Sequence, residues 1–174
     1  MHLISVTTAL SPFFDASKIK PDVLEFAKLR GTETHQGCAA YARSLPVFLS
    51  EPARPYFESF RNWFDKYVKR VLFVEAEFSD PHVYGIVGHV DLVAELTDGR
   101  IVVVDYKTPV VESMTWRAQL AAYCYLINPI VVDGGGMALM LSPEGNAARA
   151  IHYKQQASDF ANFLAALQAW RAFK

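Results

Sequence analysis

Charged residues interrupt two apolar stretches near the middle of the chain. Asp91 lies within residues 84–96, and Asp105 and Lys107 lie at the end of the next such stretch, where Val, Ile and Leu dominate. Ionisable side chains are costly to bury unless they pair with one another or bind a metal. Carboxylates that hold Mg²⁺ or Mn²⁺ beside a lysine that stabilises developing charge would suit phosphodiester hydrolysis. A buried structural ion pair is the alternative interpretation.

The geometry of the turn between the two stretches decides whether the three side chains meet. Alternation along a strand puts Asp105 and Lys107 on one face. A two-residue turn would leave Asp91 on the other face, whereas a three-residue turn with Gly99 in the left-handed conformation pairs Asp91 with Asp105. We favour the three-residue turn, although a bulge would give the same alignment. Two opposed carboxylates repel unless a cation lies between them, so this register predicts a divalent-metal site.

Four short segments follow one another in an order and spacing typical of a known family. They are Arg30-Gly31-Thr32-Glu33-Thr34-His35, Gly88-His89-Val90-Asp91, Val104-Asp105-Tyr106-Lys107-Thr108 and Gln119-Leu120-Ala121-Ala122-Tyr123. This series resembles the R-G-T-x-x-H, G-x-x-D, D-x-K and Q-x-x-x-Y motifs of the PD-(D/E)XK nucleases, in their RecB-like branch. A single D-x-K carries little weight, but four ordered motifs are specific.

The resemblance implies a role for each matching residue. His35, Asp91 and Asp105 would be metal ligands, together with the backbone carbonyl of Tyr106, and the metal would be Mg²⁺ or Mn²⁺. Lys107 would be the catalytic lysine, acting with the two aspartates. These roles come from the resemblance, since His35 by itself would pass for a surface histidine on a helix.

Further site residues follow from the same resemblance. Gln119 and Tyr123 are four residues apart and share one helix face, so both would contact the substrate backbone or brace the catalytic strand. Read alone, Tyr123 is a core residue and Gln119 an ordinary polar residue of a helix. Relatives carry an acidic residue on the first strand, and Glu75 and Glu77 are both candidates for it.

The hydrophobic pattern predicts the elements that position these residues. Helices are expected at 21–30, ending at Gly31, and at 32–45, 53–68, 115–127 and 157–173, with strands at 71–78, 84–96, 100–106, 137–141 and 150–153. The first three strands should be antiparallel, and the sheet should be covered on both faces. The predicted fold is α/β, a mixed central sheet flanked by helices with the restriction-endonuclease-like αβββαβ core. Residues 1–174 would form a single nuclease domain with an N-terminal helical part.

Composition narrows the setting in which such a domain would work. The chain has 174 residues, is 52% hydrophobic and has a formal net charge of -1, so attraction to nucleic acid would need local patches or bound metal. Cys38 and Cys124 occur in no C-x-x-C spacing, which argues against an iron-sulfur cluster and favours a reducing cytosol. Neither a signal peptide nor an apolar span of about 20 residues is found, so we expect an intracellular protein without a membrane partner. Nothing in the sequence indicates the oligomeric state.

The resemblance also suggests which kind of nuclease this is. The two isolated cysteines cannot supply the four-cysteine cluster of many RecB-like relatives. The short chain is more similar to the compact single-strand exonucleases, a group that includes the mitochondrial genome-maintenance exonuclease, and to small phage nucleases. We therefore expect an exonuclease that acts on single-stranded DNA or DNA ends. The alternatives are a double-strand-specific endonuclease, a non-cleaving nucleic-acid-binding module and a metal-stabilised interaction protein.

A preference for single strands would require stacking platforms and a positive groove. The third helix and the residues after it offer both, in Arg54, Arg61, Trp63, Lys66, Tyr67, Lys69 and Arg70. The alternative there is a solvated helix face with buried aromatic residues. Ser11-Pro12-Phe13-Phe14 is a second candidate, as a wedge between bases, with core packing as the alternative.

Overall fold

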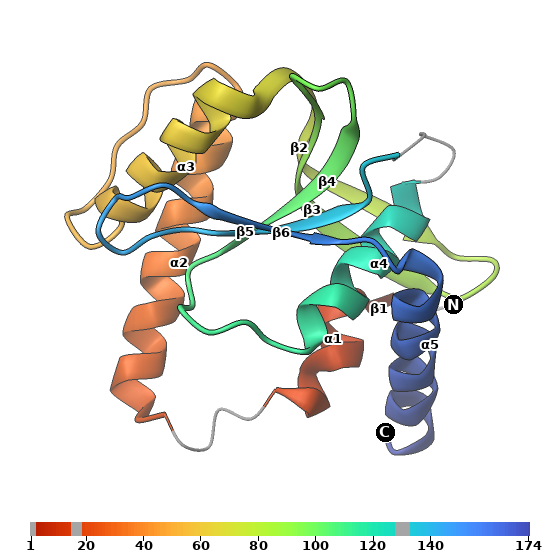
Figure 1. Ribbon diagram of the computed structural model, residues 1–174. Coiled ribbons are helices and arrows are strands. Elements are labelled where there is room, and N and C mark those ends of the chain that lie inside the picture. The colour runs from red at the N-terminus through yellow and green to blue at the C-terminus, as the bar shows by residue number, and fades with distance from the viewer. Residues whose placement is uncertain (1–2, 15–18, 128–132) are drawn as a thin grey trace.

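The helices of the chain pack around one sheet (Figure 1). The structure, a computed structural model, describes residues 3–14, 19–127 and 133–174. In chain order the elements are β1 (Ile4–Ser5), α1 (Val6–Leu10), the 3-10 turn η1 (Ser11–Phe13), α2 (Pro21–Ala42), α3 (Arg54–Tyr67), β2 (Val68–Asp80), β3 (Ile86–Leu96), β4 (Ile101–Lys107), α4 (Thr115–Ile127), β5 (Gly136–Met140), β6 (Arg149–Tyr153) and α5 (Gln156–Ala172). The predicted fold class, α/β with a mixed sheet flanked by helices, is confirmed.

Strand β3 has three neighbours in the sheet. Strand β2 lies on one side of β3 and pairs antiparallel with it along its whole length. Two strands share the other side of β3. Strand β1 pairs with it in parallel at Ile86 and Val87, and β4 pairs with it antiparallel from Leu92 to Glu95. Strands β5 and β6 continue the sheet beyond β4, first parallel and then antiparallel. The stretch of β3 between β1 and β4, which ends at Asp91, therefore has no backbone pairs with either strand.

Apolar side chains cover both faces of this sheet, as the sequence predicted. Helices α1, α4 and α5 lie over one face, where Leu120 and Phe163 join the sheet residues Val93 and Val103 in one core. Helix α3 and part of α2 cover the other face, in a second core. Among the described residues, no helix has the length and apolar character needed to cross a membrane.

The turn between β3 and β4 has the predicted three-residue form. The ladder runs from Leu92 opposite Val104 to the base of the turn, where the Leu96 amide donates to the Arg100 carbonyl at 2.8 Å. Gly99 has a φ of +90°, in the left-handed region that favours glycine. Continuing this register by one step places Asp91 opposite Asp105.

One prediction about the helices is wrong, because Gly31 does not break the first of them. Helix α2 is continuous from Pro21 to Ala42. A glycine inside a helix costs only about 1 kcal/mol relative to alanine, and neighbouring structure readily compensates for this. A Cβ atom at Gly31 would lie 3.6 Å from the Thr108 hydroxyl oxygen, so the helix passes close to the segment after β4 here.

The remaining predicted helices and all five predicted strands are present, with ends displaced by a few residues. Strand β1 and helix α1 were not predicted from the sequence. Strand β1 has only two residues and α1 only five, so neither is long enough to show a periodic pattern.

Candidate active site

Three adjacent strands each place one carboxylate in a row across the sheet. The pairs on either side of Glu75 set it opposite Asp91 on β3, and the β3–β4 register, extended one step beyond the Leu92–Val104 pair, sets Asp91 opposite Asp105. Residues opposite one another on neighbouring strands project from the same face. Glu77 instead lies opposite His89 and is exposed. The register thus identifies Glu75 as the acidic residue of the first strand that joins the row.

The backbone at Glu75 is unusual for a strand. Its φ is +47°, and the β2–β3 ladder is interrupted at this residue. Non-glycine residues adopt such angles at a cost of about 1–3 kcal/mol, and they cluster at ligand sites. One oxygen, Oε2, lies 2.7 Å from Nε2 of His89, whereas Oε1 is buried and has no hydrogen-bond partner among the described residues. The unpartnered Oε1 is thus available to a ligand.

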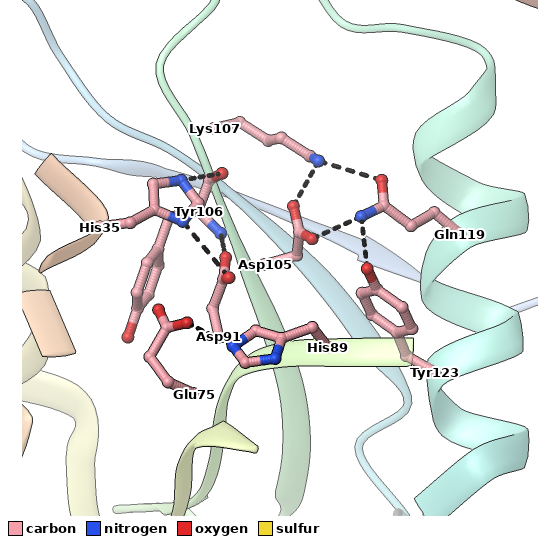
Figure 2. A network of polar contacts seen from close by, with 9 residues as sticks. All are labelled: His35, Glu75, His89, Asp91, Asp105, Tyr106, Lys107, Gln119 and Tyr123. Atoms are coloured by element: carbon pink, nitrogen blue, oxygen red, sulfur yellow. Dashed lines mark hydrogen bonds and ion pairs between the residues drawn. The ribbon is translucent and has the colours of Figure 1, made fainter. Parts of the chain in front are cut away.

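A histidine of α2 completes a group of possible metal ligands. Ligand atoms of His35, Glu75 and Asp91 all lie within 4.8 Å of one another (Figure 2). Nδ1 of His35 is 3.3 Å from Asp91 Oδ1, and its Nε2 is 3.1 Å from the backbone carbonyl oxygen of Tyr106. An imidazole, two carboxylates and a carbonyl therefore face one small volume. Glu75 takes part in this group where the sequence predicted Asp105, and the ligand role of Asp105 stays a prediction.

Asp105 belongs to a second network beside that group. Its carboxylate forms an ion pair with Lys107 and accepts a hydrogen bond of 2.7 Å from the Gln119 side-chain amide. The Gln119 carbonyl oxygen accepts from Lys107 Nζ at 3.1 Å, and the same amide donates to the Tyr123 hydroxyl at 3.1 Å. Gln119 and Tyr123 are only 9% and 3% exposed. These contacts match the bracing role, while contact of either residue with substrate stays a prediction.

Burial and charge act in opposite directions on the ionisable groups. Burial alone would raise the pKa of Asp91, but His35 and the Tyr106 amide, which donates to Asp91 at 2.7 Å, hold it below its ordinary value. Burial would likewise lower the pKa of His35, but the charge of Asp91 raises it to about 9. For Asp105, the effect of burial on the pKa is larger than the opposite effect of the Lys107 charge, and the pKa is raised. The raised pKa favours the protonated imidazole of His35, which must lose a proton to become a ligand.

Two clefts meet at these residues. The larger, of about 910 Å³, lies between α2, the sheet and the segment after β4. The smaller, of about 290 Å³, extends toward the β1–α1 junction and α4. His35, His89, Asp91 and Lys107 line both clefts. A substrate can thus reach the group of possible ligands from more than one direction.

Two residues beside the site were not singled out from the sequence. His89 contacts Glu75, and Trp116 lies in the larger cleft with its ring centre 5.3 Å from Lys107 Nζ. Spacing could have found both of them. His89 precedes Asp91 by two residues on a strand, and Trp116 precedes Gln119 by three on a helix, so each pair shares a face.

The third helix does not have the form expected of a stacking platform. Trp63 is 5% exposed and packs in the second core. Four of the cations there form ion pairs with neighbouring carboxylates, in the pairs Arg54–Glu51, Arg61–Glu58, Lys69–Glu95 and Arg70–Glu95. The alternative interpretation, a solvated face with a buried aromatic residue, describes Trp63 and these four cations, whereas Tyr67 is 40% exposed and Lys66 Nζ lies 5.0 Å from its ring centre. By contrast, Phe13 and Phe14 are 56% and 57% exposed, so core packing is the wrong interpretation for them.

The fold and the site together have the arrangement of a metal-dependent nuclease. The chain matches the PD-(D/E)XK nuclease superfamily over residues 15–172, and it belongs to this superfamily. The predicted superfamily is confirmed, and membership indicates a nuclease-type function with a nucleic-acid substrate and a divalent metal. Among curated proteins there is no match to the chain. The RecB-like branch stays a prediction.

Proposed function

We propose that the protein is a metal-dependent DNA nuclease of the RecB-like branch, which hydrolyses phosphodiester bonds of single-stranded DNA or at DNA ends. One observation carries this proposal. The row of Glu75, Asp91 and Asp105 lies in contact with His35 and Lys107 where two clefts meet. A complete set of acidic residues and lysine also favours cleavage over the alternative of a binding module. Membership of the superfamily is consistent with it.

The residues present fit Mg²⁺ or Mn²⁺. His35, Glu75, Asp91 and the Tyr106 carbonyl would hold the ion, with Asp105 at the edge of the group. Carboxylate and carbonyl oxygens are the ligands that these cations prefer, and a single imidazole suits Mn²⁺ as well. The buried, unpartnered oxygen of Glu75 supports this assignment. When bound, a divalent ion would supply Lewis-acid activation of the phosphate and of the attacking water.

Lys107 would stabilise the negative charge that develops on the phosphate. Asp105 and Gln119 hold its ammonium group at a fixed place, and the face of Trp116 lies beside it. A donor that is already oriented needs no reorganisation during the reaction, and such donors give the largest electrostatic effects on rate. Gln119 and Tyr123 would act by keeping this lysine and Asp105 in place.

The depth of the site supports a single-stranded substrate. Asp91 and Asp105 are 7% and 4% exposed, at the base of the clefts. A phosphate must therefore enter between α2 and the sheet to reach them, which is easier for a single flexible strand than for a stiff duplex. We also propose that residues 1–174 act as one nuclease domain, because the two apolar cores share a single sheet.

End-labelled single-stranded and double-stranded DNA, incubated with Mg²⁺, Mn²⁺ or EDTA, tests the proposal. We expect metal-dependent shortening of single strands and no cleavage in EDTA. The Asp105→Asn variant should lose cleavage and bind metal at least about 10-fold more weakly by calorimetry, with its fold intact. The matched control is Asp98→Asn, on the exposed β3–β4 turn. Cleavage of closed circular duplex would favour the endonuclease alternative, and an inert wild-type protein would refute nuclease activity.

A further inference from the structure

One face of helix α2 forms a continuous wall of the larger cleft. Lys28, Thr32, His35, Ala39 and Arg43 all line it. They follow one another at spacings of four, three, four and four residues, which places them on one side of a helix. The candidate metal ligand His35 thus belongs to a longer surface that runs along the helix and onto its C-terminal cap residue.

The wall extends beyond the metal-ligand group in both directions. At 1.5 Å per residue, Lys28 and Arg43 are about 22 Å apart along the helix axis, with His35 about 10 Å from Lys28. Each arm is longer than one nucleotide of an extended strand. A strand that lies along this wall with one phosphate at His35 therefore has room for further nucleotides on both sides of that phosphate.

The charges along the wall are placed for a polyanion. Lys28 and Arg43 are both exposed, and neither has a carboxylate partner among residues 3–14, 19–127 and 133–174. Other surface cations have a carboxylate partner close by, as Arg61 has in Glu58 and Arg100 in Asp98. The two ends of the wall therefore carry positive charge that is free to meet phosphate.

Two further features of the wall support the same use. The Arg43 guanidinium donates to the Val74 carbonyl at 2.8 Å, which holds it beside the strand that carries Glu75. Between the two cations Gly31 lines the same cleft, and because it has no side chain, a nucleic-acid backbone can lie close to the helix there.

We propose that this face of α2 binds a single nucleic-acid strand on both sides of the phosphate that is cleaved. Lys28 contacts a phosphate on one side and Arg43 a phosphate on the other. Because the strand occupies both arms, the first cut from an end releases an oligonucleotide and not a single nucleotide. This inference rests on the proposed nuclease function and adds its product and its strand-binding surface.

Binding is tested with fluorescein-labelled dT12 and dA12 by anisotropy in EDTA, where no cleavage occurs. Lys28→Gln and Arg43→Gln should each weaken binding on the order of 10-fold at low salt, equally for both sequences. Each should also reduce the salt dependence of log Kd by about 1. The control is Arg61→Gln, a cation paired outside the cleft, which should change neither value. Thermal melting checks that each variant is folded.

Product analysis tests the second half of the inference. A 5′-labelled and a 3′-labelled 30-mer of dT, cut under conditions where each strand is cleaved once, should give labelled first products of two or more nucleotides. Mononucleotides as the sole first product from either end would overturn the inference while leaving nuclease activity intact. So would wild-type affinity in both variants. A wild-type protein that neither binds nor cleaves would overturn the proposed function as well.

Discussion

At the scale of single residues, the site contains ionisable side chains whose charged forms are disfavoured by burial. Asp105 is the clearest example, because burial raises its pKa even though Lys107 is in direct contact. Asp91, with a charged His35 and a backbone amide as partners, has a lowered pKa. The pKa values of two carboxylates opposite one another on neighbouring strands are thus shifted in opposite directions. Their different partners account for the difference.

The role of Lys107 can be tested by Lys107→Ala. If it stabilises charge during phosphoryl transfer, cleavage should slow by about 100-fold or more, while DNA binding and metal affinity stay nearly unchanged. A lysine that served only as half of an ion pair would instead cost roughly 3 to 5 kcal/mol of stability when removed. We expect a smaller loss, because Asp105, whose pKa burial raises, can take up a proton once its partner is gone.

Two measurements on this variant separate the two roles. Single-turnover cleavage with Mg²⁺ reports the chemical step, and thermal melting in EDTA reports stability without bound metal. Lys66→Ala, on the solvated side of α3, is the matched control for loss of a cation. Normal cleavage by Lys107→Ala would end the case for this lysine as a catalyst, whatever its melting temperature.

At the scale of elements, the turn that joins β2 to β3 is organised by one carboxylate. Asp80 accepts hydrogen bonds from the backbone amides of His82, Val83 and Tyr84, at 3.2, 2.9 and 3.0 Å, and from the Tyr125 hydroxyl of α4 at 2.9 Å. The Val83 amide is the largest of the causes that lower the pKa of Asp80 below its ordinary value of 3.8. The turn therefore depends on the ionised form.

This dependence predicts how stability should vary with pH. A carboxylate whose pKa is lowered by folding contributes stability above its unfolded value, near 3.8, and this contribution is lost as the pH falls through the lowered folded pKa. Asp80→Asn should cost about 1 kcal/mol at pH 7, and the difference from wild type should shrink below pH 3.8. Urea unfolding across pH 3 to 7 measures it. A difference independent of pH would contradict the role of the charge.

Glycines show how closely the elements approach one another around the site. A Cβ atom at Gly88 on β3 would lie 2.8 Å from Leu126 Cδ1 and 2.9 Å from the ring of Tyr123 on α4. Gly88→Ala should therefore displace α4 and the network of Tyr123, at a cost of about 1–3 kcal/mol, and slow cleavage. Gly31→Ala, in the interior of α2 with only an ordinary contact, should stabilise by roughly 0.5–1 kcal/mol.

Denaturant unfolding and cleavage assays on both variants measure these effects. For stability, Gly31→Ala serves as the control, since it adds the same methyl group at a glycine where the new atom meets only an ordinary contact. A Gly88→Ala variant as stable and as active as wild type would show that α4 can move away from β3 without cost.

The sequence was sufficient to predict the helices and strands with long hydrophobic patterns. It was also sufficient to predict the β3–β4 register, which depends on the turn residue Gly99. Gly99 could take the left-handed angle of a three-residue turn, and that turn aligned Asp91 with Asp105. Glu75 could not be chosen over Glu77, because the choice depends on the register that the turn at 81–85 sets between β2 and β3. The helix break predicted at Gly31 was wrong, because the unfavourable helix propensity of one glycine was taken as decisive. Contacts made by the surrounding helix outweigh it.

At the scale of the whole molecule, the site lies between two separately packed halves. Helices α1, α4 and α5 share one core, while α2 and α3 belong to the other. Helix α2 contributes Cys38 and Ala39 to buried packing, but Val23, Phe26 and Leu29 in its first half are exposed. Its contact with the sheet at His35 is polar and involves charged groups. Divalent metal bound by His35, Glu75 and Asp91 would therefore join α2 to β2 and β3.

This arrangement predicts that the metal stabilises the fold as well as enabling chemistry. A ligand present at 100 times its Kd stabilises the folded state by about 2.7 kcal/mol, which corresponds to a rise in melting temperature of roughly 5 to 10 °C for a chain of this size. We expect such a rise with Mn²⁺ or Mg²⁺ over EDTA, and none in Asp91→Asn. Sodium chloride at equal ionic strength controls for screening of surface charges, which a divalent salt would also produce. If Asp91→Asn melted with the same metal-dependent rise as wild type, the ions would be binding elsewhere, and the link between α2 and the sheet would have to come from the protein alone.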